Sequence, residues 1–204
     1  MKIKNEMYIF DLENGKIVGV DEAGRGPLAG PVVAAVAKLK SFDEKLNKIN
    51  DSKKLSEKSR EELFEIIKEH FYIGIGIATV EEIDNVNILN ATFLAMRRAL
   101  AQIEDEKIFF ERVLVDGNHK IREYSGEQLP IIKGDSKSLS IAAASIIAKV
   151  TRDRIMLDIA KDYPEYVFEK HKGYGTKLHR EIIITKGPIE GIHRKSFLKK
   201  ILGE

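Results

Sequence analysis

The sequence predicts an α/β fold, in which helices flank a β-sheet, on the strength of three observations. Short apolar runs of strand length recur along the 204 residues. Longer segments carry apolar residues at steps of three and four, which is typical of amphipathic helices. Turn-forming residues end some of the apolar runs, such as Asp116-Gly117-Asn118 after 113–115 and Gly134 after 129–133. The length suits one substantial core, so we expect one main domain.

Five segments are predicted as strands: 17–20, 32–37, 72–77, 113–115 and 129–133. The second follows the first closely, so we expect these two strands to be antiparallel. The third alternates with a period of two, which is the period of a strand. The fourth is wholly apolar, as expected for a strand covered on both faces. Gly134 ends the fifth.

Three longer helices are predicted around these strands. Ser59 and Glu62 have the spacing of a capping box, so the first helix should begin there and run to about His70. The second buries one face, made of residues at alternating steps of four and three: Leu89, Phe93, Met96, Leu100 and Ile103. The third runs from Ser138 to about Asp162, and its alanines and serines would let it pack closely on the sheet.

After Pro164 the sequence predicts loops and short helices, with a turn-rich segment at 171–176 and a last basic helix at 196–201. From Lys170 onward nine Lys and Arg outnumber three Glu, a net charge of +6; the whole chain carries +2, so the rest carries −4. An acidic body joined to a basic tail suits a polyanionic substrate. A solvated, charge-rich surface would explain the tail equally well.

Composition excludes several classes of protein. No apolar stretch reaches the roughly 18 residues that a membrane-spanning helix needs. Residues 1–6 lack the apolar segment of a secretory signal, and the chain has no cysteine to form a disulfide. We therefore expect a cytoplasmic protein without membrane association.

Carboxylates stand at the ends of three predicted strands. Asp21 and Glu22 follow the first, Asp116 follows the fourth, and Asp135 comes just after the fifth. If the strands are neighbours these acids converge, and adjacent carboxylates are costly unless a proton or a cation lies between them. They would supply oxygen ligands for two divalent cations, which stand about 3.5 to 4 Å apart in phosphodiester-cleaving sites. An ordinary polar turn remains an alternative for the first pair taken alone.

The first acidic pair raises two further questions. Consecutive residues of a regular strand point to opposite faces, so Asp21 and Glu22 share a site only if the strand bends or ends between them, where Gly24 could help. Three glycines between residues 24 and 30 also suggest a dinucleotide-binding turn. Pro27 and Pro31 would interrupt its helix, and the acids would repel a pyrophosphate. A metal site facing a nucleic-acid backbone fits these residues better.

Over nearly its whole length the chain resembles bacterial ribonuclease HII, the type 2 ribonuclease H family. The resemblance rests on six ordered blocks: 21–27 (DEAGRGP), 51–55 (DSKKL), 115–118 (VDGN), 133–135 (KGD), 142–153 (AAASIIAKVTRD) and 171–176 (HKGYGT). It implies a ribonuclease H-like fold, with a central mixed β-sheet flanked by helices and a small C-terminal helical region. The implied catalytic domain is 1–162, and 163–204 would be a basic substrate-binding segment packed on it.

The resemblance also implies an activity. The family hydrolyses the RNA strand of RNA/DNA hybrids and incises duplex DNA on the 5′ side of an embedded ribonucleotide, leaving 3′-hydroxyl and 5′-phosphate ends. By this resemblance, the catalytic and metal-binding carboxylates are Asp21, Glu22, Asp116 and Asp135. They would hold two divalent cations during catalysis, Mg²⁺ or Mn²⁺, which both take oxygen ligands. The implied partners are RNA/DNA hybrid and ribonucleotide-containing duplex DNA.

The same resemblance assigns substrate contacts. Gly24, Arg25 and Gly26 would contact the ribonucleotide through backbone groups, because glycine lets the main chain approach a ribose closely. Tyr174 would pack on the sugar of the nucleotide that follows. Arg25 could instead be a structural ion-pair partner, and Tyr174 a buried core residue. The predicted phosphate contacts, which could equally be solvated lysines, are Lys53, Lys149 and Lys172.

Three other polar residues have open roles. Asp153 is either a further acid near the site or an ion-pair partner of Lys149 or Arg154. His119 and His179 have no metal-ligand spacing to another histidine, and we expect them at the surface or beside site residues.

Rival functions remain open from the sequence. A junction resolvase or a type 1 ribonuclease H would use a similar fold, and a non-catalytic nucleic-acid-binding module would not need four acids at strand ends. Residues 196–201 lack the leading glutamine and paired aromatics of a sliding-clamp-binding peptide, so we expect no protein partner and a monomer.

Overall fold

The computed structural model describes residues 5–203. Most of residues 1–6, where the sequence predicted no secretory signal, therefore lies outside the described residues. Five strands form one mixed sheet in the order β3-β2-β1-β4-β5. The strands are β1 (Ile17–Ala23), β2 (Val32–Leu39), β3 (Phe71–Ala78), β4 (Arg112–Asp116) and β5 (Gln128–Ile131). As predicted, β1 and β2 are antiparallel, whereas β1, β4 and β5 run parallel to one another.

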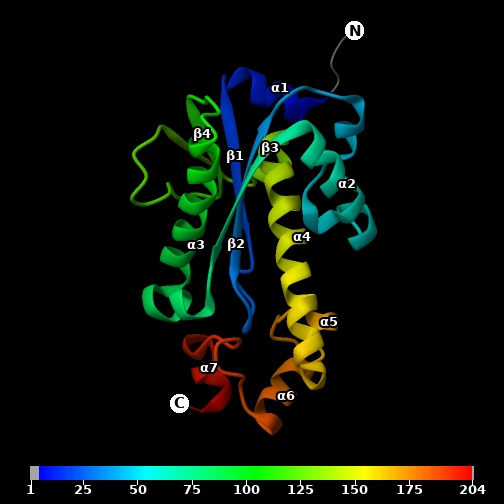
Figure 1. Cartoon of the computed structure of the whole chain (residues 1–204), viewed down its shortest axis with the longest axis vertical. Helices are drawn as coiled ribbons and strands as arrows, with labels where there is room; N and C mark the ends of the chain where they lie inside the picture. Colours follow the sequence, from blue (N-terminus) through cyan, green and yellow to red (C-terminus); the bar gives the residue numbers. More distant parts are fainter. Residues whose placement is uncertain (1–4, 204) are drawn as a thin grey trace.

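Helices cover both faces of the sheet (Figure 1). On one face α3 (Val80–Asp105) packs against a cluster that includes Val18, Val20 and Val36. On the other face lie α4 (Leu139–Asp162) and α2 (Glu57–His70). A Cβ atom at Gly19 would stand 2.3 Å from the carbonyl carbon of Ser140, so α4 lies directly on β1. This close packing confirms what the small residues of α4 predicted.

Helix α1 (Glu6–Glu13) was not predicted, yet it helps to hold α4 in place. Its buried Asp11 accepts hydrogen bonds from Ser138 Oγ at 2.5 Å and from the backbone N–H of Ser140 at 2.8 Å. A carboxylate at this position satisfies free N–H groups at the start of α4 and complements the helix dipole. Burial raises the pKa of Asp11 to about 6, although these hydrogen bonds lower it.

One predicted helix start was wrong in detail, and another helix has an interruption that the sequence analysis did not address. Helix α2 begins at Glu57, and its N-cap is Ser56, whose Oγ accepts from the N–H of Ser59 at 3.1 Å. The predicted capping box at Ser59 therefore lies inside the first turn, because an earlier serine at the same spacing captures the free N–H group. Helix α3 is interrupted at Asn87, which has a φ of 66° and caps the second part of the helix with its side chain.

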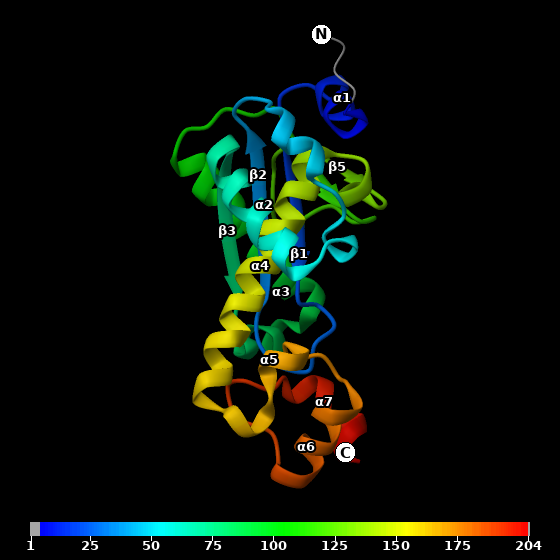
Figure 2. The same cartoon turned by 90° about the vertical axis from the view of Figure 1, so that its right-hand side faces the viewer.

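Short helices fill the connections and the C-terminal end. Three 3₁₀ segments precede α4: η1 (Glu44–Lys48), η2 (Ser52–Lys54) and η3 (Gly134–Ser136). After α4 come η4 (Pro164–Tyr166), α5 (Phe168–His171), α6 (Lys177–Lys186) and α7 (Lys195–Leu202), which gather around the C-terminal end of α4 (Figure 2). The predicted basic last helix is confirmed as α7. None of the described helices is long and apolar enough to cross a membrane.

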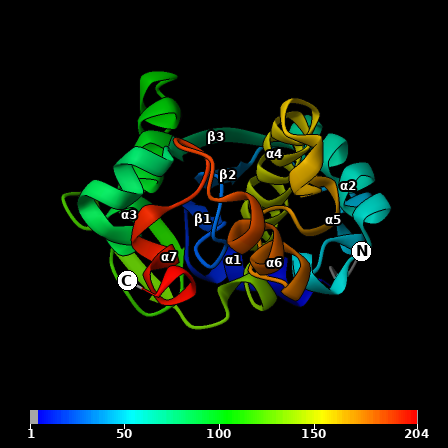
Figure 3. The same ribbon diagram turned by 90° about the horizontal axis from the view of Figure 1, so that it is seen from below.

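The C-terminal segment is tied to the loop that follows β1. Leu28 exchanges two backbone hydrogen bonds with it, donating to Gly173 at 2.8 Å and accepting from Arg194 at 2.9 Å. Ala29 forms an isolated β-bridge with His193. Seen from below, α6 and α7 lie beneath the sheet, between the ends of α3 and α4 (Figure 3). The proposed division at 162/163 thus falls at the end of α4, and the second part packs on the first.

Candidate active site

Three of the four predicted acids line one cavity, of about 240 Å³. Asp21 lies in β1 and Asp116 ends the neighbouring parallel strand β4, whose Val115 pairs with Val20. The lining comprises Asp21, Glu22, Ala23, Gly24, Arg25, Gly26, Ser52, Lys53, Asp116, Ser145, Lys149 and Tyr174. Asp135 lies just outside the cavity, in η3. Burial and the nearby charge of Asp116 raise the pKa of Asp135. Parallel neighbouring strands thus bring the acids together, as predicted.

The pairing of β1 explains how Asp21 and Glu22 share this cavity. We expected the strand to bend or end between them, but β1 continues through Ala23. Its pairing with β4 stops at Val20, so the edge of β1 beyond that residue is open. Both side chains reach the cavity at this open edge, and Oδ1 of Asp21 accepts a 2.7 Å hydrogen bond from the N–H of Glu22.

The acids disfavour one another's charge. Burial raises the pKa of Asp21 well above its usual value, and the charges of Glu22 and Asp116 raise it further. Burial also raises the pKa of Glu22, although Arg25, at 3.3 Å, lowers it. Burial and the charge of Asp116 raise the pKa of Asp135. Such a cluster favours a bound proton or an added cation.

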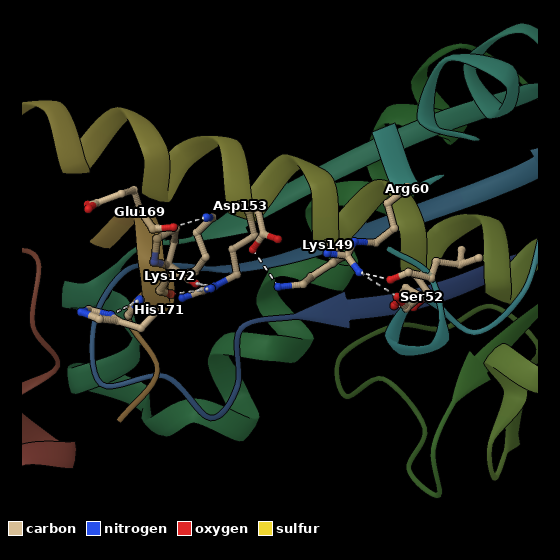
Figure 4. A network of polar contacts seen from close by, with 12 residues as sticks. Ser52, Arg60, Lys149, Asp153, Glu169, His171 and Lys172 are labelled. Atoms are coloured by element: carbon tan, nitrogen blue, oxygen red, sulfur yellow. Dashed lines mark hydrogen bonds and ion pairs between the residues drawn. The ribbon is translucent and has the colours of Figure 1, made fainter. Parts of the chain in front are cut away.

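The three predicted phosphate-binding lysines differ in position (Figure 4 labels two of them). Burial would lower the pKa of Lys53, but the acids around it, Asp135 first, raise it overall, so its ammonium faces the cluster. Lys149 lines the cavity and forms a 2.7 Å ion pair with Asp153, which decides the open role of Asp153 in favour of the ion pair. Lys172 turns back to the carbonyl of Glu169 at 2.6 Å, outside the cavity lining.

The glycine turn and Tyr174 form further parts of the cavity wall. Arg25 is half exposed and pairs with Glu22, so the ion-pair alternative describes it in this structure. A Cβ at Gly24, where φ is +100°, would meet Arg152 at 2.2 Å, whereas a Cβ at Gly26 would meet nothing within 4 Å. Tyr174 is 41% exposed, which excludes the buried-core alternative, and its ring lies 5.6 Å from the ammonium of Lys149.

Two buried arginines beneath this wall were missed by the sequence analysis. Arg152 and Arg194 are both fully buried and donate to backbone carbonyls. Arg152 binds the carbonyls of Pro31, Ala29 and Lys172 at 3.0 Å each. Arg194 binds those of Gly24, Arg25, Gly30 and Pro31. No local pattern separates such residues from surface arginines, because their acceptors lie far away in the sequence.

Other polar residues were also missed or placed only roughly. The hydroxyls of Ser52 and Ser145 lie 2.9 Å apart in the buried wall, and the nearby Ser145 hydroxyl lowers the pKa of Asp21, against the larger effect of burial. His119 is exposed. His179 is fully buried, and its Nδ1 lies 2.9 Å from the carbonyl oxygen of Tyr174. It therefore lies beside a site residue, which was one of the two places expected for it. Within residues 5–203, no three acid, histidine or cysteine side chains already form a group that could hold a metal ion.

Comparison with known proteins identifies the family. The sequence pattern of Ribonuclease HII matches residues 18–200 of this chain. The Ribonuclease HII of Fusobacterium nucleatum is 66% identical over 199 residues, covering 97% of this chain and 93% of that protein. The chain belongs to the ribonuclease HII family. It is therefore an endoribonuclease of the ribonuclease H type.

Solved structures agree with this membership. The PCNA:RNase HII complex of Archaeoglobus fulgidus contains a chain that is 28% identical to this one, with a TM-score of 0.71, covering 88% of this chain and 94% of that one. Bst-RNase HIII in complex with Mn²⁺ has a TM-score of 0.73 and covers 98% of this chain and 71% of that one. At 20% identity the second likeness concerns the fold alone. The predicted ribonuclease H-like fold is confirmed.

Proposed function

We propose that this ribonuclease HII hydrolyses the RNA strand of RNA/DNA hybrids and also incises duplex DNA on the 5′ side of a single embedded ribonucleotide. The products would be a 3′-hydroxyl and a 5′-phosphate. One observation carries the proposal: the cavity lined by Asp21, Glu22 and Asp116 is also lined by Gly24–Gly26 and Tyr174. Hydrolytic groups and groups suited to a ribose therefore face the same space.

The donor set fits two hard divalent cations, Mg²⁺ or Mn²⁺. The four carboxylates supply only oxygen, and no histidine is among the residues that line the cavity. The raised pKa values of Asp21, Glu22 and Asp135 support this, because a cation beside these carboxylates would stabilise their charged forms. Asp21, Glu22, Asp116 and Asp135 would hold the ions, which would activate water and neutralise charge on the scissile phosphate. Glu22 would exchange its contact with Arg25 for this role.

The chain's own groups would position the substrate. Asp116 is fixed by a 2.7 Å hydrogen bond from the N–H of Gly134 to its Oδ1, so its other oxygen remains for the cavity. Lys53 and Lys149 present ammonium groups to the cavity and would bind flanking phosphates. Gly26 has open space where a side chain would be, although nothing in the chain itself requires glycine there. That space would admit the ribose close to the main chain.

Discrimination between RNA and DNA requires reading the 2′-hydroxyl, which both donates and accepts hydrogen bonds. Within residues 5–203, the N–H groups of Arg25 and Gly26 donate to no protein acceptor. They are thus available to the 2′-oxygen. The exposed ring of Tyr174 would pack on the sugar of the following nucleotide.

The site needs no group from another protein, so we propose that the chain acts as a monomer, and in the cytoplasm given its lack of cysteine. The PCNA complex concerns the Archaeoglobus protein. Residues 196–201 of this chain lie within α7, where Leu198 is buried rather than free to enter a partner.

The deciding experiment is an incision assay on a DNA duplex with one ribonucleotide, run with Mg²⁺, with Mn²⁺ and with a chelator. We expect a single cut on the 5′ side with either metal and none with the chelator. Asp116→Asn should lower the rate by at least about a thousandfold while preserving the circular dichroism spectrum and duplex binding. An intact duplex with wild-type enzyme would favour a type 1 ribonuclease H, and near-normal cutting by Asp116→Asn would refute the metal assignment.

A further inference from the structure

We propose that two consecutive residues, His193 and Arg194, are positioning residues that hold in place the two segments of the cavity wall proposed to read the substrate, the glycine turn and the loop of Tyr174. Arg194 orients the peptide groups of the glycine turn, and His193 acts through His179 on the loop of Tyr174. This inference rests on the proposed function, because it assigns a role in ribose reading. Both residues are almost completely buried, and neither touches the cavity itself.

The arginine arm acts through two carbonyls. Nη2 of Arg194 donates to the carbonyl of Gly24 at 2.6 Å, and Nη1 donates to that of Arg25 at 3.1 Å. No peptide bond of the described chain is cis, and in a trans peptide the N–H points opposite to the C=O. Drawing these two carbonyls inward therefore directs the N–H groups of Arg25 and Gly26 away from Arg194. Neither of these two N–H groups has a protein acceptor within residues 5–203.

The histidine arm is a chain of hydrogen bonds with only one consistent proton arrangement. Nδ1 of His193 accepts from the N–H of Ile189 at 2.9 Å, so the ring proton lies on Nε2. That proton is donated to Nε2 of His179 at 3.1 Å. Nδ1 of His179 must then carry its own proton, which it donates to the carbonyl of Tyr174 at 2.9 Å. The imidazole of His193 thus fixes the tautomer that holds the Tyr174 loop.

The backbone joins the two arms. His193 forms the β-bridge with Ala29, and the N–H of Arg194 donates to the carbonyl of Leu28 at 2.9 Å. The dipeptide is therefore docked on the loop that follows β1. Its arginine side chain holds the glycine turn, and its histidine side chain holds the Tyr174 loop through His179. Gly24 and Tyr174 are far apart in the sequence. Because the dipeptide His193-Arg194 holds both of their loops, it sets the distance between them.

The test compares binding to two DNA duplexes that differ by a single 2′-hydroxyl, in the presence of EDTA so that no cleavage occurs. The variants are Arg194→Lys, His193→Leu and His193→Gln. Lysine keeps the charge but cannot bind several carbonyls in one plane. Leucine removes the hydrogen bond to His179. Glutamine can accept from Ile189 and donate to His179, so it should rescue. Arg154→Lys, at an exposed ion pair on α4, is the matched control.

We expect wild type, His193→Gln and Arg154→Lys to prefer the ribonucleotide duplex to the same degree. In Arg194→Lys and His193→Leu the ratio of the two Kd values should fall about tenfold, which is the effect expected from one or two misaligned hydrogen bonds. Nitrogen-15 spectra should also show shifted amide signals of Arg25 and Gly26 in Arg194→Lys. In His193→Leu they should show a changed ring-nitrogen tautomer signal of His179. These spectral changes do not depend on substrate.

The outcomes separate this inference from the proposed function. If wild type binds the two duplexes equally, the proposed ribose reading fails, whatever the spectra show. If wild type discriminates but folded Arg194→Lys and His193→Leu keep the full preference with unshifted signals, the positioning roles are wrong. Should Arg194→Lys fail to fold, the pair His193→Leu and His193→Gln decides, since loss without rescue by glutamine would also overturn the proposal.

Discussion

Lys149 and Asp153 form a 2.7 Å ion pair one turn apart on α4, with the ammonium also 5.6 Å from the ring of Tyr174. The pair is largely shielded from water, with exposed side-chain fractions of 23% and 10%. A lysine held in this way has lost much of its freedom before substrate arrives. It is therefore better prepared to meet a phosphate than a free surface lysine.

Lys149→Met should weaken duplex binding and reduce the salt dependence of log K by about 1, as expected for the loss of one phosphate contact. It should also destabilise the fold by roughly 1 to 3 kcal/mol, because Asp153 is left without its partner. Lys149→Met/Asp153→Asn should regain stability but not affinity. Binding titrations at several salt concentrations and urea unfolding measure the two effects. An unchanged salt slope would argue against a phosphate contact.

Asp21→Asn should make the metal-free protein more stable, by roughly 1 kcal/mol or more, while abolishing cleavage. Burial, Glu22 and Asp116 all raise the pKa of Asp21, so its charged form is costly in the folded state. The hydrogen bond from the N–H of Glu22 can be kept by the asparagine oxygen. Thermal unfolding in EDTA measures the change, and a lower Tm in the variant would contradict it.

Added Mg²⁺ or Mn²⁺ should raise the Tm of wild type in a concentration-dependent way. Binding to the native state alone stabilises by about 2.7 kcal/mol when the cation is present at a hundred times its Kd. The gain should be much smaller in Asp21→Asn, which lacks one ligand. Equal gains in both proteins would place the bound cation elsewhere.

Gly24→Ala and Gly26→Ala should behave differently. At Gly24 the φ of +100° and the 2.2 Å approach of Arg152 leave no room for a Cβ, so alanine should destabilise the protein by about 2 kcal/mol or more. At Gly26 a Cβ meets no protein atom within 4 Å, so Gly26→Ala should keep the wild-type Tm. It should nevertheless raise KM for ribonucleotide duplexes. Thermal unfolding and steady-state kinetics of both variants test this contrast. A wild-type KM in Gly26→Ala would contradict the proposal that the ribose approaches the main chain closely at Gly26.

Tyr174→Ala should impair incision at a single ribonucleotide more than hydrolysis of long RNA/DNA hybrids. The exposed ring supplies a packing surface for one sugar, and longer hybrids offer other cut positions. Tyr174→Phe keeps that surface and should remain close to wild type. Parallel assays on the two substrates give the ratio. Equal losses on both would show that Tyr174 does not recognise the junction between RNA and DNA.

Stability should fall as the pH drops from about 6.5 to about 4 because of His179 and His193. Burial lowers the pKa of each to about 4, while the unfolded chain takes up these protons near the ordinary value of 6.5. Between these values the unfolded state binds more protons, so acid favours unfolding. His193→Gln removes one such group and should reduce the slope by up to about 1.4 kcal/mol per pH unit. Urea unfolding of wild type and His193→Gln across this pH range tests the prediction. The two proteins have the same carboxylates, so a difference in slope reports the histidine. Parallel pH profiles would mean that His193 titrates normally when folded.

Most of the fold and the acidic cluster could be predicted because their signals are local. Ser138 does cap α4, and the wholly apolar segment 113–115 is the buried centre of β4. Each acid was recognisable from its place at the end of an apolar run. That they meet depends on β1, β4 and β5 being parallel neighbours, which the sequence made plausible and the sheet order decided.

The sequence by itself therefore predicted the five strands, three of the longer helices and the acidic residues at the strand ends, although α1 carried no signal that was recognised. Only the tertiary structure decided which buried polar groups hold that chemistry in place. Arg194 and Gly24 are 170 positions apart, and the hydrogen bond between them leaves no periodic trace in the sequence. Hydrophobic periodicity reports one element and its buried face, whereas a hydrogen bond between distant segments depends on where the folded chain brings them together.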